Sequence, residues 1–241
     1  MRLLIGSDVT SRYTRRNAVE YHNIASYIHS VVSSRKGNYM VFCPSHQFLT
    51  EVYDAYLTYF YDEKNVECLV QTEYMDETAR ENFLSRFKGQ ESAQWDLTGK
   101  ICMEIEQEDK TLLGFCVLGG LFSEGIDLKG EALIGAIVVG TGLLQVCRER
   151  EILMEYFDER GDNGFDYAYR YPGMNKVLQA AGRVIRTAQD RGIVALLDER
   201  FELPVYQKMF PREWEHFTVV SQKECQSAVQ EFWSKNDISS L

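Results

Sequence analysis

The sequence predicts an α/β fold in which a doubly wound, mainly parallel β-sheet is flanked by helices on both faces. Five short runs rich in aliphatic and β-branched residues recur along the 241-residue chain. They are continuously apolar rather than alternating, as in strands that are covered on both faces. Helical patterns lie between them, and this alternation is typical of parallel sheets. No internal repeat or low-complexity linker appears, so we expect one domain over residues 1–241.

Each element follows from its own stretch of sequence. The predicted strands cover Tyr39–Cys43, Val66–Val70, Leu112–Leu118, Ile134–Val139 and Ile193–Leu197. The predicted helices cover Ala18–Ser33, Gln47–Tyr61, Glu77–Lys88, Leu144–Arg160, Asn175–Thr187 and Lys223–Ser234. Loops are expected over Arg160–Asn163 and Tyr167–Pro172, and an excursion over Gly89–Asp109. The apolar run in Met1–Gly6 is too short for a signal peptide, and we expect it to be the edge of an element in a segment of a longer polypeptide.

Composition limits the classes of function. A hydrophobic content of 45% with 12% aromatic residues excludes disorder of the whole chain. The chain has 26 basic and 36 acidic residues, a net charge of −10, so any contact with nucleic acid must be local. The longest apolar run, Ala132–Val146, contains three glycines and is too short to span a bilayer, so no membrane is expected.

The cysteines predict neither a zinc site nor an iron–sulfur cluster in this chain. They are scattered, they form no CxxC or Cys/His pair, and several lie within apolar runs. We therefore expect reduced core cysteines in a cytoplasmic protein. The six are Cys43, Cys68, Cys102, Cys116, Cys147 and Cys225.

Chemically suggestive residues follow the predicted strands. In such sheets, ligands bind beyond the carboxyl ends of the strands. We therefore expect four segments to gather at one edge of the sheet. They are Pro44–His46, Gly119–Asp127, Gly140–Gly142 and Asp198–Arg200.

The segment Gln179–Arg186 has the pattern of an anion-binding helix face. At about 100° per residue, Gln179, Arg183 and Arg186 fall on a stripe roughly 60° wide. No acid occurs between Asn175 and Gln189, and arginine forks match phosphate oxygens. Gly182 costs about 1 kcal/mol of helix propensity relative to alanine, which a close approach of another surface would justify. The alternative is a surface helix whose arginines pair with acids elsewhere.

The segment Gly119–Asp127 is a second candidate for anion binding. Its three glycines permit a tight backbone path that exposes amides. Ser123 can donate to a phosphate, and Glu124 and Asp127 can accept from hydroxyl groups, arginine or metal-bound water. The Gly-Lys-Ser/Thr ending of a Walker A loop is absent from the chain. The alternative is a loop that is rich in glycine for topological reasons.

Together these segments form an ordered series that resembles motifs IV to VI of superfamily 2 helicases of the DinG/XPD group. The resemblance spans about residues 3–205 and fades beyond Phe210. Motif IV matches Gly37–Ser45, motif V Gly120–Leu128 and motif VI Gln179–Arg186. Further matches lie at Asp8–Tyr13, Gly135–Leu143, Asp190–Gly192 and Leu196–Phe201. The resemblance implies that the chain has a RecA-like fold and is the second motor domain of an ATP-dependent DNA helicase. The first RecA-like domain of the same polypeptide, which supplies the Walker A and B motifs, is absent here.

The resemblance also implies roles for individual residues. Arg183 and Arg186 match the arginines that reach the γ-phosphate, and Gln179 matches the residue that orients water or phosphate. Glu124, Gly125 and Asp127 match the nucleotide-coupling loop, with Gly182 beside the arginines. ATP and Mg²⁺ would be shared with the first domain, which would also carry any iron–sulfur cluster, so isolated turnover is doubtful.

The resemblance implies a path for single-stranded DNA as well. Ser45, His46 and Ser123 are candidate contacts, and Gly120 stands where many superfamily 2 proteins have threonine, so its contact must differ or come from the backbone. The segment Asp8–Lys36 has a local charge excess of +3 and forms a basic strip, with Tyr13 for stacking. Its basic residues are Arg12, Arg15, Arg16, Arg35 and Lys36. The alternative for this strip is the solvated basic end of an N-terminal helix.

Two other functions remain open. One is a non-catalytic α/β module that binds a nucleotide, DNA or another protein. The other is a cofactor enzyme that uses the turn Gly140–Gly142, which lacks the Gly-x-Gly-x-x-Gly spacing.

Overall fold

The computed structural model describes residues 1–88, 110–122, 128, 130–184 and 190–234. Within them, seven strands form one sheet in the order β3-β4-β2-β5-β6-β1-β7, and every pairing is parallel. The strands are β1 (Arg2–Gly6), β2 (Asn38–Cys43), β3 (Val66–Val70), β4 (Thr111–Val117), β5 (Gly135–Val139), β6 (Ile193–Leu197) and β7 (Phe217–Val220). The predicted parallel α/β fold is therefore confirmed.

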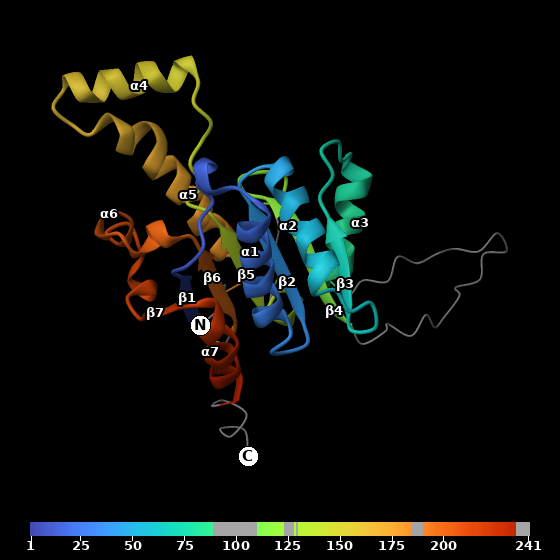
Figure 1. Ribbon diagram of the computed structural model, residues 1–241. Coiled ribbons are helices and arrows are strands. Elements are labelled where there is room, and N and C mark those ends of the chain that lie inside the picture. The colour runs from blue at the N-terminus through green and yellow to red at the C-terminus, as the bar shows by residue number, and fades with distance from the viewer. Residues whose placement is uncertain (89–109, 123–127, 129, 185–189, 235–241) are drawn as a thin grey trace.

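Helices cover both faces of the sheet (Figure 1). The long helices are α1 (Ala18–Val32), α2 (His46–Tyr59), α3 (Glu77–Lys88), α4 (Arg148–Glu159), α5 (Tyr171–Ala181) and α7 (Gln222–Ser234). The first core, beneath α1, α2 and α7, includes Leu4 and Val41. The second, beneath α3 and α5, includes Leu3 and Met40, because successive strand residues point to opposite faces. This explains why the strand sequences are continuously apolar.

Short elements complete the chain and cover the remaining edges. They are the 3₁₀ turns η1 (Tyr13–Arg15), η2 (Gly130–Ala132), η4 (Glu199–Glu202) and η5 (Arg212–Trp214), the π-helix η3 (Asp166–Arg170) and the helix α6 (Pro204–Gln207). Phe201, Tyr206 and Trp214 from this group are buried in the second core. The segment between β6 and β7 therefore belongs to the domain, although the helicase resemblance fades there.

Two helices begin at side-chain caps. Asn17 accepts a hydrogen bond from the amide of Glu20 and starts α1, and Ser45 accepts one from the amide of Phe48 and starts α2. Capping satisfies amides that have no partner within the helix. Because the strands are parallel, both starts lie at the carboxyl edge of the sheet.

The prediction for the segment before motif VI is wrong. Tyr167–Pro172, expected as loop, forms most of η3 and the first turn of α5. Ala168 and Tyr169 are buried and continue the apolar face of the helix. Pro172 sits in the first turn of α5, where a missing amide is tolerated.

The same helix also ends earlier than predicted. It stops at Ala181, and the amides of Arg183 and Val184 bond to the carbonyls of Ala180 and Ala181 in tighter turns. Gly182, a poor helix former, lies at this change. Arg183 therefore lies beyond the α-helix. The sequence interpretation placed Gln179 and Arg183 on one helical stripe, and it is corrected on this point.

Helix α4 projects from the carboxyl edge of the sheet (Figure 1). It has no buried residue and packs against η3, where the rings of Phe157 and Tyr167 stack with centroids 3.9 Å apart. No helix in the described ranges is long and apolar enough to cross a membrane. The excursion Gly89–Asp109 lies outside the described residues.

Candidate functional site

The candidate site is the carboxyl edge of the sheet. Ser45 follows β2, Gly119 follows β4, Thr141 follows β5 and Asp198 follows β6. Parallel pairing of these strands brings all four loops to one edge, as predicted. What each loop can do depends on its own contacts.

The motif VI segment presents Gln179 to solvent in the last turn of α5. Gly182 is also exposed, and Arg183 is half-buried. Arg186 lies outside the described residues, so the relation between the two arginines stays a prediction. In the described part, Lys176 of α5 is the residue that lies against the loop that follows β4.

Motif V is described as far as Phe122, whereas Ser123, Glu124, Gly125 and Asp127 lie outside the described residues. Phe122 is fully buried and its ring lies 4.3 Å from that of Phe83, which anchors the start of the loop. Gly119 has a φ of +75°, a conformation that side chains rarely adopt.

The Gly120 backbone lies in a confined space. A Cβ there would lie 3.1 Å from the carbonyl oxygen of Val117 and 3.3 Å from Nε2 of Gln71. Gln71 is buried and its Oε1 accepts a hydrogen bond from the amide of Val117. This packing gives a physical reason for glycine at a position where many superfamily 2 proteins have threonine.

Lys176, which the sequence interpretation missed, lies directly over the loop that carries motif V. A Cβ at Gly119 would come within 2.6 Å of its Cδ, Cε and Nζ atoms. Burial and the nearby charge of Arg150 lower the pKa of Lys176. Arg150 itself donates to the carbonyl of Ala168 at 3.1 Å. One feature of the sequence indicates its position: Lys176 precedes Gln179 by three residues and therefore lies on the same helix face.

The turn after β5 meets the start of α5 backbone to backbone. A Cβ at Gly142, where φ is +68°, would lie 2.3 Å from the carbonyl oxygen of Gly173. A Cβ at Gly173 would lie 2.9 Å from the carbonyl oxygen of Thr141. Close packing therefore accounts for these glycines without a cofactor.

Asp198 organises the N-terminal segment. It is fully buried and accepts hydrogen bonds from the amide (2.8 Å) and hydroxyl (2.9 Å) of Ser11 and from Nε and a terminal nitrogen of Arg200, both at 2.7 Å. Burial acts to raise the pKa of the Asp198 carboxyl, but the hydrogen bonds and charge of Arg200, with the Ser11 amide, hold it below its ordinary value.

Two arginines of the predicted DNA strip pair with acids. Arg12 lies 3.3 Å from Glu199, and Arg15 lies 3.1 Å from Glu20 and 3.3 Å from Glu199. Both guanidinium groups remain about half exposed, and exposed pairs of this kind contribute about 0.2–1 kcal/mol. These contacts join η1 to the end of β6.

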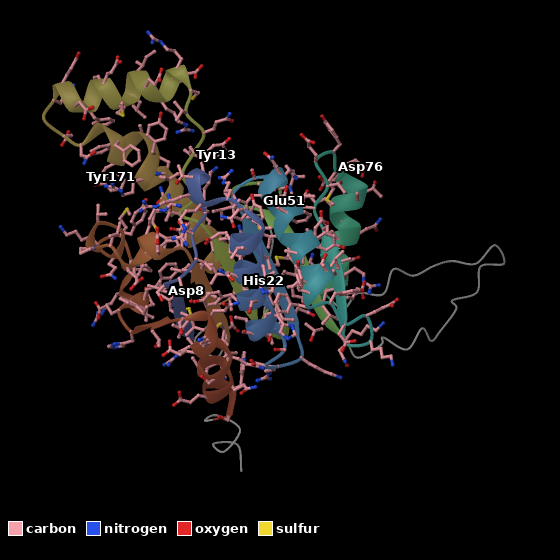
Figure 2. All side chains as sticks on the ribbon, viewed as in Figure 1. Asp8, Tyr13, His22, Glu51, Asp76 and Tyr171 are labelled. Carbon is pink, nitrogen blue, oxygen red and sulfur yellow. The ribbon has the colours of Figure 1, made fainter. Side chains whose placement is uncertain are left out.

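An aromatic and basic hollow lies beside this strip, with a volume of about 330 Å³. Its lining residues are Tyr13, Arg16, Tyr21, Gln47 and Phe48. The Arg16 guanidinium lies 5.5 Å from the Tyr13 ring and 5.2 Å from the Phe48 ring, and its Nε donates to the carbonyl of Ser11. Tyr13 is 83% exposed and lies at the same end of the molecule as Glu51 (Figure 2).

Ser45 and His46 border this hollow, because Gln47 and Phe48 follow them in the first turn of α2. The Ser45 hydroxyl already accepts from the Phe48 amide at 3.2 Å. The sequence interpretation placed Arg16 in the basic strip but did not assign Gln47 to a site. Their positions become informative only once η1 lies against α2.

Within the described ranges, no group of histidine, cysteine, aspartate or glutamate could hold a metal ion. Cys43, Cys116 and Cys225 are buried, and Cys147 is exposed. Burial raises the pKa of the Cys225 thiol to about 12. Cys102 lies outside the described residues.

Comparison with known families identifies this arrangement. The helicase C-terminal domain family matches residues 28–217. This chain belongs to that family. A protein of Methanocaldococcus jannaschii named as a probable ATP-dependent helicase is 33% identical to this helicase domain over 116 residues, 44% of the chain and 18% of the relative.

The XPD helicase of Sulfolobus acidocaldarius is 25% identical over 214 residues, 85% of the helicase domain and 32% of the relative. A solved structure of apo XPD aligns with 91% of the domain and 40% of its own chain, at 20% identity and a TM-score of 0.68. That likeness shows the RecA-like fold. The helicase domain spans less than a third of the length of these two curated relatives.

Proposed function

We propose that this chain is the second motor domain of an ATP-dependent DNA helicase and supplies the groups that couple ATP hydrolysis to movement on DNA. Membership of the helicase C-terminal domain family supports this proposal. The observation that carries it is the packing of α5 on the loop that carries motif V, where Lys176 lies over Gly119 one turn before the exposed Gln179. A shift of either segment would move the other.

In the proposed reaction, a first RecA-like domain of the same polypeptide holds ATP and Mg²⁺. Arg183 and Arg186 reach the γ-phosphate and stabilise charge on the transferring phosphoryl group, while Gln179 orients the attacking water. Arginines in this role raise turnover by about 10³–10⁵ in other phosphoryl-transfer enzymes. Glu124, Gly125 and Asp127 carry the nucleotide state to the DNA path.

Single-stranded DNA would cross the hollow at η1 and the start of α2. Tyr13 and Phe48 provide aromatic surfaces for bases, and Arg16 and Gln47 provide donors for phosphate oxygens. The amides at the start of α2, next to Ser45 and His46, favour a phosphate by their partial positive charge. Such a local surface is compatible with a net charge of −10.

The test replaces Arg183 and Arg186 by alanine together in the full-length polypeptide. We expect near-complete loss of DNA-stimulated ATPase activity, with thermal stability and DNA binding largely kept. The matched control removes two exposed cations remote from this edge, Lys208→Ala with Arg212→Ala, and should retain activity. Wild-type turnover in the first variant would contradict the arginine assignment.

A non-catalytic module that binds nucleotide or DNA makes a different prediction. It would bind its ligand without any dependence of turnover on Arg183 or Arg186. A Gly-Lys-Thr/Ser loop encoded upstream of Met1 supports the motor, and robust ATP hydrolysis by the isolated chain would contradict the half-motor proposal.

A further inference from the structure

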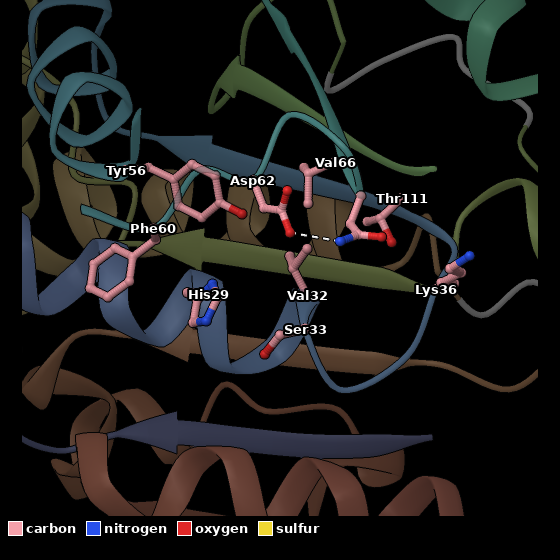
Figure 3. Close-up of a pocket in the computed structure, with 10 residues that line it drawn as sticks. His29, Val32, Ser33, Lys36, Tyr56, Phe60, Asp62, Val66 and Thr111 are labelled. Atoms are coloured by element: carbon pink, nitrogen blue, oxygen red, sulfur yellow. Dashed lines mark hydrogen bonds between the residues drawn. The ribbon is translucent and has the colours of Figure 1, made fainter. Parts of the chain in front are cut away.

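A second cavity lies at the opposite, amino-terminal edge of the sheet (Figure 3). It has a volume of about 300 Å³, at the lower end of the range for small-molecule sites. It lies between the ends of α1 and α2 and the starts of β3 and β4, and the proposed motor function does not use it. Its lining residues are His29, Val32, Ser33, Lys36, Tyr56, Phe60, Asp62, Asn65, Val66 and Thr111.

The buried hydroxyl of Tyr56 points into this cavity (Figure 3). Tyr56 is 0% exposed, and among the described residues its Oη atom has no hydrogen-bond partner. A buried hydroxyl without a partner destabilises the fold, because it has lost its hydrogen bonds to water. Burial also raises the pKa of Tyr56, so the hydroxyl stays protonated and can donate. A ligand that carries an acceptor would recover this cost.

One wall of the cavity is aromatic. The rings of His29 and Phe60 stack with centroids 5.2 Å apart and planes 23° from parallel. Burial lowers the pKa of His29, so the imidazole is neutral at neutral pH. A neutral stacked pair favours a flat partner whose ring can pack beside it.

The charged side chains that line the cavity are Asp62 and Lys36, and both already have interaction partners. The Asp62 carboxylate already accepts from Nδ2 of Asn65 at 2.6 Å and from the amide of Lys64 at 3.0 Å. The C-termini of α1 and α2, which end here, carry partial negative charge and disfavour an anion. A cation would lose its hydration against Val32 and Val66. The Asp62 carboxylate is already hydrogen-bonded and would not offset that cost.

We propose that this cavity binds a neutral, planar aromatic or heteroaromatic molecule whose carbonyl or ring nitrogen accepts a hydrogen bond from Tyr56. The acceptor would meet the buried hydroxyl, and the ring would lie against Phe60 and His29. The site is separate from the carboxyl edge, so its ligand need not be ATP or DNA.

The experiment titrates the whole chain with three probes of one shape, benzamide, benzoate and benzamidinium, and follows amide NMR signals. We expect benzamide to cause saturable shifts around Ser33, Phe60 and Val66, and to bind more tightly than either charged probe. Absence of saturable shifts with benzamide would overturn the proposal. Tighter binding of benzoate or benzamidinium would also overturn it.

Tyr56→Phe tests the hydroxyl. It should weaken benzamide binding about fivefold, the loss of one neutral hydrogen bond. Because the hydroxyl has no hydrogen-bond partner among the described residues, Tyr56→Phe should melt at the same or a higher temperature than the wild type. Tyr59→Phe, on the exposed side of α2, is the matched control and should leave affinity unchanged. Unchanged affinity in Tyr56→Phe would overturn the assignment.

Val66→Phe provides a second, independent variant. Val66 lines the cavity and is only half-buried, so a larger ring at this position should fill the space with limited effect on the core. We expect benzamide binding to be abolished while the thermal transition is kept. Benzamide that still binds with wild-type shifts would place the ligand elsewhere and overturn the proposal.

Discussion

Lys176 lies across the backbone of Gly119, so close that a Cβ on this glycine would come within 2.6 Å of the lysine Nζ. The contact joins α5, which carries motif VI, to the start of the loop that carries motif V. It requires a glycine with positive φ on one side and a long side chain on the other. The two residues are 57 positions apart, so no local sequence pattern predicts their contact.

The depressed pKa of Lys176 predicts a pH effect on stability. A lysine whose folded-state pKa is lowered binds fewer protons when folded than when unfolded. Its contribution to the free energy of unfolding therefore becomes more favourable as pH rises toward the ordinary lysine pKa, about 10.4. Relative to Lys176→Met, the wild type should therefore gain free energy of unfolding between neutral pH and about pH 10. Urea unfolding of both proteins across this range measures the difference, and a constant difference would contradict the shift.

The close backbone contact between Gly142 and Gly173 predicts that a single added methyl group strongly lowers the free energy of unfolding. Gly142→Ala must place its Cβ 2.3 Å from a carbonyl oxygen in addition to its positive φ, and should lose more than about 3 kcal/mol of stability. Gly161→Ala is the control, because Gly161 has a φ of +84° and nothing within 4 Å of its Cβ position. It should lose only about 1–2 kcal/mol. Equal losses in urea unfolding would show that the backbone contact is unimportant.

The buried contacts of Asp198 predict that the stability it gives to the N-terminal segment is lost in acid. Asp198→Asn should cost about 3–5 kcal/mol at neutral pH, because Arg200 would lose a buried partner. The folded-state pKa of Asp198 is lowered, so its stabilisation is present above the unfolded-state pKa of about 3.9 and is lost as pH falls through the lower folded value. The difference between variant and wild type should therefore shrink in acid. Chemical unfolding at pH 7 and pH 3 provides the comparison.

Arg16 and Arg12 should differ in their effects on DNA. Arg16 lines the aromatic hollow, whereas Arg12 pairs with Glu199. Arg16→Ala should weaken oligothymidine binding about three- to tenfold and reduce the salt slope by about 1. Arg12→Ala should change both much less. Fluorescence anisotropy at several salt concentrations tests this, and a larger effect of Arg12→Ala would place the DNA path beside Glu199 and not across the hollow.

The parallel α/β fold and the order of the motifs follow from the amino-acid sequence alone. Strands at Val66–Val70 and Ile193–Leu197 and the helix Glu77–Lys88 match their predicted bounds, because residue periodicity reports local burial. The half-exposed edge strand Phe217–Val220 was not predicted, since its short run lacks the continuous burial of the central strands. The start of α5 was missed because Pro172 and Gly173 usually mark loops.

Which side chains share the candidate site depends instead on how distant segments pack together. Arg12 and Arg15 have the composition of a DNA strip, yet Glu199, more than 180 residues later, lies between them. Arg16, Gln47 and Phe48 meet because η1 folds against the start of α2. Lys176 meets Gly119 because α5 packs against β5 and the lysine side chain reaches the loop after β4. Periodicity reports the face on which a residue lies, whereas its partner depends on the path of the whole chain.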